Sequence, residues 1–314
     1  MNKHRAILII TLLIVPGCIQ QGQKTLIKQI SVSCKHHHQL KTSIDLCEQS
    51  HPPVITIWIH GTRLLPKSLF KTFFYSKPGL HHYSEIDSIY YQHKIAQMII
   101  DSNPEQFPAA TFYLFGWSGA LSFEERECAA RKLYEDLKVI CFTYRQTYGV
   151  APVIRIISHS HGGNIALLLE KVKDSDDSQL FIDQLLLLAC PVQIQTMKYV
   201  QSNIFGKVYS LYSLLDILQL ADPQGLQNKD KKEDIPLFSK RFFTPHEKIE
   251  QVAIKMDDRS LMHIEFIKPK FLAQLSKIVN TIDQWHQSSS LSSAQWTSRE
   301  KCLCISTRAP QTRS

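Results

Sequence analysis

The feature that most constrains the fold is the run Ile156–Asn164, where an apolar stretch meets a helical pattern through a very short turn. The residues two before and two after Ser160 are small, Ser158 and Gly162. Bulky side chains at those places would collide with the neighbouring strand and helix. The run therefore predicts a sharp strand-to-helix turn with Ser160 at its tip. It also leaves the backbone N–H of His161 at a helix N-terminus, where amides attract negative charge.

Short apolar runs alternate with helical patterns along most of the chain. The segments expected to form strands are Val54–Ile59, Ala110–Phe115, Val153–Ile157, Gln184–Ala189, Lys207–Ser213 and Glu250–Met256. The segments expected to form helices are Ile86–Ser102, Ser122–Val139, Ile165–Lys173, Ile194–Val200 and Pro269–Trp285. Buried strands that alternate with amphipathic helices form a parallel sheet covered on both faces. We therefore predict an α/β fold with a mostly parallel sheet of about six or more strands and helices on both faces.

The turn at residues 158–163 resembles the nucleophile elbow of the α/β-hydrolase superfamily, in particular its lipases and esterases. The family usually has glycine where this chain has Ser158. A second similarity is His-Gly-Thr at residues 60–62, directly after the first strand. The resemblance implies that Ser160 is the nucleophile and that the backbone amides of Thr62 and His161 form an oxyanion hole.

The same resemblance assigns the acid and the base by their places after later strands. Asp216 lies three residues past the strand Lys207–Ser213, and Asp222 is the rival candidate for the acid. His263 lies in the loop between the last strand and the closing helix, where the family has its general base. The chain order serine, aspartate, histidine is that of the α/β hydrolases.

The resemblance covers residues 54–285 and implies a serine hydrolase that cleaves carboxylic esters through an acyl-enzyme, without a cofactor. The aromatic insertion Arg63–Tyr91 and the segment Ile217–Leu220 either line an apolar pocket for an ester or lipid-like substrate or pack on the sheet. Thioesterases, amidases and peptidases share the fold, so they remain alternatives. A further alternative is a non-catalytic lipoprotein that uses the fold for binding.

The N-terminus resembles a bacterial lipoprotein signal. Basic residues precede the apolar run Ala6–Val15, which is too short to span a bilayer, and Cys18 follows Pro16 and Gly17. We predict a signal peptide over 1–17, lipidation of Cys18, a tether over 18–52 and attachment to a membrane of the bacterial cell envelope. An ordinary secretory signal, which would give a secreted or periplasmic protein, is the alternative. The histidines at 36–38 lie in the tether and have no second ligand cluster, so no metal site is predicted.

The net charge of +8 sits mainly at the two ends of the chain. Residues 1–52 carry +4 and residues 286–314 carry +3, which leaves +1 for the residues between them. A nearly neutral body does not favour a nucleic-acid partner, whereas basic ends fit a membrane surface. We therefore predict a hydrolase domain over 53–285 and, from its Ser, Gln and Thr content, a disordered tail over 286–314.

Overall fold

The structure is a computed structural model that describes residues 52–62, 77–173, 180–224, 237–290 and 301–307. The chain divides into two compact units. The larger unit comprises Pro53–Tyr134 and Val153–Ser314, and the smaller comprises Met1–Pro52 and Glu135–Pro152. The described part of the smaller unit contains the end of helix α3 (Phe123–Tyr148). The predicted signal peptide, Cys18 and the tether up to residue 51 lie outside the described residues, so they stay predictions.

The larger unit is built on a nine-stranded sheet. In spatial order its strands are β2 (Gly79–His82), β3 (Phe112–Gly116), β1 (Val54–Ile59), β4 (Val153–His159), β5 (Ile182–Leu188), β6 (Phe205–Tyr212), β7 (Ile249–Met256) and β8 (Arg259–Ser260), with β9 (Lys301–Ile305) beside β7. The strands from β3 to β7 run parallel, as does β9, whereas β2 and β8 are antiparallel to their neighbours. The prediction of an α/β fold with a mostly parallel sheet is confirmed.

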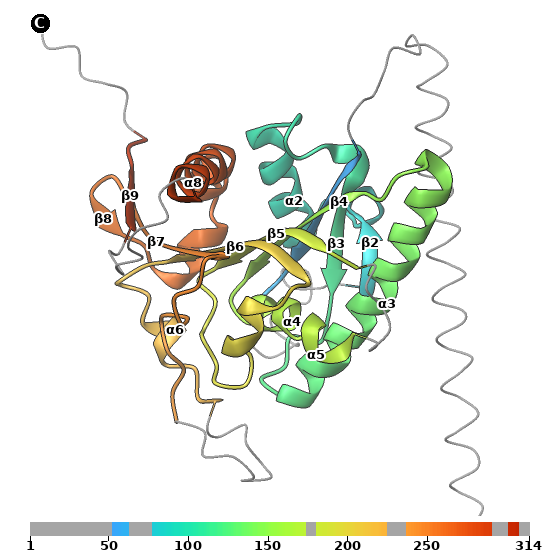
Figure 1. The fold of residues 1–314 in the computed structure, drawn as a ribbon. Coiled ribbons are helices and arrows are strands. Elements are labelled where there is room, and N and C mark those ends of the chain that lie inside the picture. The colour runs from blue at the N-terminus through green and yellow to red at the C-terminus, as the bar shows by residue number, and fades with distance from the viewer. Residues whose placement is uncertain (1–51, 63–76, 174–179, 225–236, 291–300, 308–314) are drawn as a thin grey trace, which may run out of the picture. The chain divides into compact units, whose positions relative to one another are not determined.

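Helices of the larger unit lie on both faces of this sheet. Figure 1 shows α2 (Tyr91–Ser102) and α8 (Leu275–Ser290) on one face, with α4 (Gly162–Leu167) and α5 (Leu169–Val172) on the other. The shorter helices are α6 (Ile217–Leu220), α7 (Pro269–Leu272) and the 3-10 turns η1 (Tyr83–Glu85), η2 (Ala109–Thr111), η3 (Met197–Gln201) and η5 (His263–Ile267). No described helix is both long and apolar enough to cross a membrane.

The core between the sheet and the helices α2 and α8 follows from helical periodicity. Ile95 and Ile99 lie four residues apart on α2, and Ile278 and Ile282 repeat the spacing on α8, so each pair faces the sheet. All four side chains are almost completely buried. Burial of one such side chain stabilises the fold by about 1.5–3 kcal/mol. This packing makes the sheet a rigid base, at one edge of which the loops after β1, β4, β6 and β7 meet.

The prediction of a disordered tail over 286–314 is wrong for part of its range. Helix α8 extends to Ser290, and Lys301–Ile305 forms strand β9 parallel to β7. The cause is a short apolar run, Cys302–Ile305, which the surrounding Ser- and Gln-rich composition hides. Ile305 is buried against the sheet, and the ammonium of Lys301 lies 2.7 Å from a carboxylate oxygen of buried Glu250.

Candidate active site

The turn after β4 holds Ser160 in a left-handed backbone conformation, with φ of 53°. Such a conformation is unusual for a residue other than glycine and is maintained where the surroundings over-determine it. Here the Ser160 N–H donates to the carbonyl of Leu188 at 2.9 Å, and the Ser160 carbonyl accepts from Gly163 at 3.0 Å. The predicted elbow is therefore present, and Ser160 stands at its tip.

Two glycines let the loop after β1 lie directly against this elbow. A Cβ atom on Gly61 would come 2.7 Å from the Cβ of Ser160, and one on Gly162 would come 2.6 Å from the carbonyl oxygen of Ile59. Neither contact leaves room for a side chain. The close approach brings Thr62 and His161 beside Ser160, and both line the same cavity as the serine. The oxyanion role of these two amides stays a prediction.

The acid and base candidates meet in a hydrogen bond. Nδ1 of His263 lies 2.8 Å from Oδ2 of Asp216, whose side chain is fully buried. Asp216 caps α6, since its Oδ1 accepts from the N–H of Gln219 at 3.0 Å. Because a carboxylate only accepts hydrogen bonds, Nδ1 of His263 carries the hydrogen and Nε2 has the lone pair that a general base needs.

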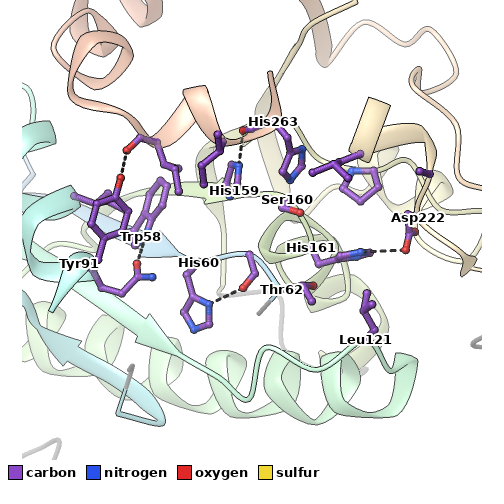
Figure 2. Close-up of a pocket in the computed structure, with 18 of the residues that line it drawn as sticks. Trp58, His60, Thr62, Tyr91, Leu121, His159, Ser160, His161, Asp222 and His263 are labelled. Atoms are coloured by element: carbon purple, nitrogen blue, oxygen red, sulfur yellow. Dashed lines mark hydrogen bonds and ion pairs between the residues drawn. The ribbon is translucent and has the colours of Figure 1, made fainter. Parts of the chain in front are cut away.

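The serine and this histidine are neighbours without a hydrogen bond in the structure. Ser160 and His263 line one cavity, yet the structure records no hydrogen bond between the hydroxyl and the ring. Bonds of this kind are often long in a free enzyme and tighten when the substrate binds. Ser160 and His263 therefore lie close together in the same cavity (Figure 2).

The cavity has a volume of about 450 Å³, which fits a small organic ligand. In Figure 2, Trp58 and Tyr91 lie to one side of Ser160, and Leu121 and Asp222 lie to the other. The polar atoms of the two aromatic rings are already used: Trp58 donates to Gln92 at 2.7 Å and Tyr91 donates to the carbonyl of Ile267 at 2.7 Å. That side of the cavity therefore presents mainly apolar ring faces to a ligand.

Fewer residues of the two predicted segments line the cavity than the sequence suggested. Within the described part of the insertion Arg63–Tyr91, Tyr91 lines the cavity, and within Ile217–Leu220 the lining residue is Leu218. Tyr83 packs on Phe112 instead, with ring centres 6.4 Å apart. Four further aromatic residues of the insertion, Phe70, Phe73, Phe74 and Tyr75, lie outside the described residues.

A second histidine–aspartate pair lies beside the first and was not predicted. Nε2 of His161 is 3.1 Å from Oδ1 of Asp222, and Gln193 donates to Oδ2 of the same carboxylate at 2.7 Å. Asp222, the rival for the acid, therefore contacts His161 and not His263. Burial lowers the pKa of His161 below its ordinary value of 6.5 despite the carboxylate. Burial alone would raise the pKa of Asp222, but the hydrogen bonds from His161 and Gln193 outweigh it and lower the pKa. The pair is thus a neutral imidazole beside a carboxylate.

Sequence reasoning also missed the side-chain role of His159, the residue before the nucleophile, whose ring contacts His263. No local sequence pattern marks these contacts, because the partners lie in loops after other strands. Among the described residues, no group of three or more His, Cys, Asp or Glu side chains is arranged to hold a metal ion.

No known protein family matches the sequence, and no curated protein is similar to it. Several solved structures are similar in chain path, among them two esterases. One is a hyperthermophilic esterase from the archaeon Pyrobaculum calidifontis, at 11% identity and a TM-score of 0.39, over 78% of this chain and 77% of that chain. The other is a mutant of the rice cell wall degrading esterase LipA from Xanthomonas oryzae, at 9% identity and a TM-score of 0.29, over 81% of this chain and 75% of that chain. At such distant similarity, function has to be inferred from the site.

Proposed function

We propose that the protein is a serine hydrolase that cleaves carboxylic esters. The observation that carries the proposal is the hydrogen bond between the buried Asp216 and His263, which lines the same cavity as Ser160 at its left-handed turn. A serine hydroxyl becomes a nucleophile at neutral pH when an oriented histidine can take its proton. Ser160, His263 and Asp216 offer that combination in the chain order of α/β hydrolases.

The chemistry follows from these positions. Oγ of Ser160 attacks the ester carbonyl and its proton passes to Nε2 of His263. The carbonyl oxygen becomes an oxyanion, which the backbone amides of Thr62 and His161 stabilise. When the carbonyl re-forms, the C–O bond to the alcohol breaks and the alcohol leaves with the proton from His263. Water, deprotonated by the same histidine, then releases the acid and restores the serine.

Asp216 supports this cycle without moving a proton itself. Its carboxylate fixes the hydrogen of His263 on Nδ1, so Nε2 stays basic, and it stabilises the imidazolium that forms after proton transfer. Because its side chain is fully buried, water does not screen this interaction.

The substrate we propose has an apolar acyl group of short to medium length. Trp58, Ile95 and Ile267 line the cavity and are buried, and they carry no charge. Each methylene buried there contributes about 0.8 kcal/mol, or about a fourfold change in affinity. The value of kcat/KM for p-nitrophenyl esters should therefore rise by up to about 15-fold for each added pair of methylenes until the cavity is full. If kcat/KM does not change with acyl chain length, the proposed acyl preference is wrong, but the proposal of an ester hydrolase is unaffected.

The alternatives predict different reactions. A thioesterase, amidase or peptidase would use the same groups but prefer another leaving group, so thioester, anilide and peptide substrates belong in the same assay. A binding protein that only retains the fold would not react with a fluorophosphonate.

The decisive variant is Ser160→Ala, which we expect to lower turnover by on the order of 10⁴–10⁶-fold and to abolish fluorophosphonate labelling. Ser158→Ala is the matched control. Ser158 lies two residues before Ser160, on β4, and is buried. Its hydroxyl donates to the carbonyl of Leu186 at 3.0 Å and takes no part in the proposed reaction. A folded Ser160→Ala protein with wild-type hydrolysis would disprove the proposal.

A further inference from the structure

His159 makes a contact that the proposed reaction does not use. It is the last residue of β4, directly before the nucleophile, and its side chain is buried. Its Nε2 lies 3.1 Å from the backbone carbonyl oxygen of His263, and the two imidazole rings are 4.8 Å apart between centres. Figure 2 shows this contact on the wall of the cavity next to Ser160.

The partner fixes the protonation of His159. A carbonyl oxygen only accepts hydrogen bonds, so Nε2 of His159 carries the hydrogen and Nδ1 does not. Burial, followed by the nearby ring of His263, holds the pKa of His159 well below its ordinary value of 6.5. His159 therefore stays neutral and adds no positive charge next to His263, whose ring must itself accept a proton during the reaction.

Leu261, Phe266 and Ile267 anchor the two ends of the loop that carries His263 in the core, but the residues directly beside His263 are not buried. Met262 and Ile264, on either side of it, are 57% and 44% exposed. The ion pair of Arg259 with Glu265 and the hydrogen bond from Met262 N–H to Glu265 at 2.7 Å join residues within the same loop. These local contacts and the buried flanks fix the ends of the loop, while the bond from His159 acts on the backbone of His263 itself.

We propose that His159 is a positioning residue that sets the distance between the base and the nucleophile; the inference rests on the proposed function. Its hydrogen bond joins the backbone of His263 to the residue next to Ser160, while Asp216 holds the ring at Nδ1. Two anchors, one on the backbone and one on the ring, define the direction of Nε2. A misplacement of about 1 Å in such a site costs on the order of 10²-fold in rate.

The test compares His159→Gln with His159→Met. The two side chains have similar length and shape, but only glutamine carries an N–H donor for the carbonyl of His263. We expect His159→Gln to keep kcat for a p-nitrophenyl ester within about threefold of wild type. His159→Met should lower kcat by about 10–100-fold while KM changes less than about twofold relative to His159→Gln, because the lost hydrogen bond acts on the base and both variants fill the same space in the cavity wall.

His82 provides the matched control, since its Nε2 lies 3.0 Å from the backbone carbonyl of Ala109, far along the chain from the active-site residues. His82→Gln and His82→Met should have equal kcat. If His159→Met does not fold, His159→Asn replaces it, because its amide is one methylene too short to reach the carbonyl. Equal kcat for a donor and a non-donor variant at position 159 would overturn the positioning role. A wild-type protein without ester hydrolysis would instead contradict the proposed function.

Discussion

The histidines of two histidine–aspartate pairs line the same cavity, and the pairs differ in what the second ring nitrogen does. In the pair of His263 with Asp216, Asp216 holds Nδ1, and Nε2 makes no hydrogen bond to another described residue. In the pair of His161 with Asp222, Asp222 holds Nε2, and the side-chain amide of Asn164 lies 3.5 Å from Nδ1. A base needs a nitrogen with an accessible lone pair, so the first pair can move a proton and the second is fixed in place.

The pair of His161 with Asp222 is also held in place by further buried groups. Asp222 also accepts from Gln193, which in turn accepts from the buried guanidinium of Arg126 at 3.3 Å. Burial lowers the pKa of Arg126 to about 10, and the nearby charge of Asp222 partly offsets that effect. This network joins α3, the loop after β5 and the elbow, so we assign it to stability and to the placement of His161. The comparison teaches that residue type and proximity to the serine do not by themselves identify a catalytic pair.

The two pairs should differ most in their effect on turnover. Asp216→Asn should lower kcat by on the order of 10³–10⁴-fold, because an amide at that place no longer fixes the tautomer or stabilises the imidazolium. Asp222→Asn should lower kcat less than about tenfold, since no proton passes through that pair. Steady-state rates with one p-nitrophenyl ester measure both. Near-normal turnover of Asp216→Asn with a collapse for Asp222→Asn would exchange the two assignments.

For the free energy of unfolding, the change at Asp222 should have the larger effect and the change at Asp216 the smaller. Asp222→Ala leaves the N–H of His161, the amide of Gln193 and the charge of Arg126 buried without their carboxylate. We expect a loss of about 3 kcal/mol in the free energy of unfolding. Asp216→Asn keeps an acceptor for the N–H of Gln219 and should cost about 1 kcal/mol or less. Urea denaturation at constant pH checks this, and equal losses would show that both pairs are structural to the same degree.

The pH dependence of stability tests whether the buried ring of His161 is neutral. The folded pKa of His161 is below 6.5, so the unfolded state binds protons first as the pH falls. The stabilisation from keeping this ring neutral is present above about pH 6.5 and is lost as the pH falls toward the folded pKa, by at most about 1.4 kcal/mol per pH unit. His161→Gln should therefore unfold with a shallower pH dependence between about pH 7 and pH 5. A slope unchanged from wild type would contradict the buried, neutral state of His161.

The sequence predicted what depends on local patterns. The apolar run Val54–Ile59 is strand β1, and the small residues around Ser160 form the expected turn. The segments Lys207–Ser213 and Glu250–Met256 correspond closely to β6 and β7, so the candidates Asp216 and His263 were found from their places after strands. The fold therefore follows from short-range patterns, whereas the candidates for the central residues of the site also needed the resemblance to α/β hydrolases.

The features that were missed depend on long-range contacts. The partnership of His161 with Asp222 joins residues from two separate loops, and nothing in the neighbourhood of either residue reveals it. The same is true of the contact between His159 and the backbone of His263. Strand β9 was missed because its five residues are outweighed by a polar neighbourhood, and its stability comes from pairing with β7.

The most direct test of the account is the rate at which a fluorophosphonate labels Ser160 in the wild type, His263→Gln and His161→Gln. The adduct is located by mass spectrometry of peptides, and folding of each variant is confirmed by circular dichroism. We predict a single adduct on Ser160 in the wild type, a labelling rate lower by about 10³-fold or more in His263→Gln, and a rate within about tenfold of wild type in His161→Gln. A wild type that is not labelled at Ser160, or labelling that depends on His161 and not on His263, would contradict the account.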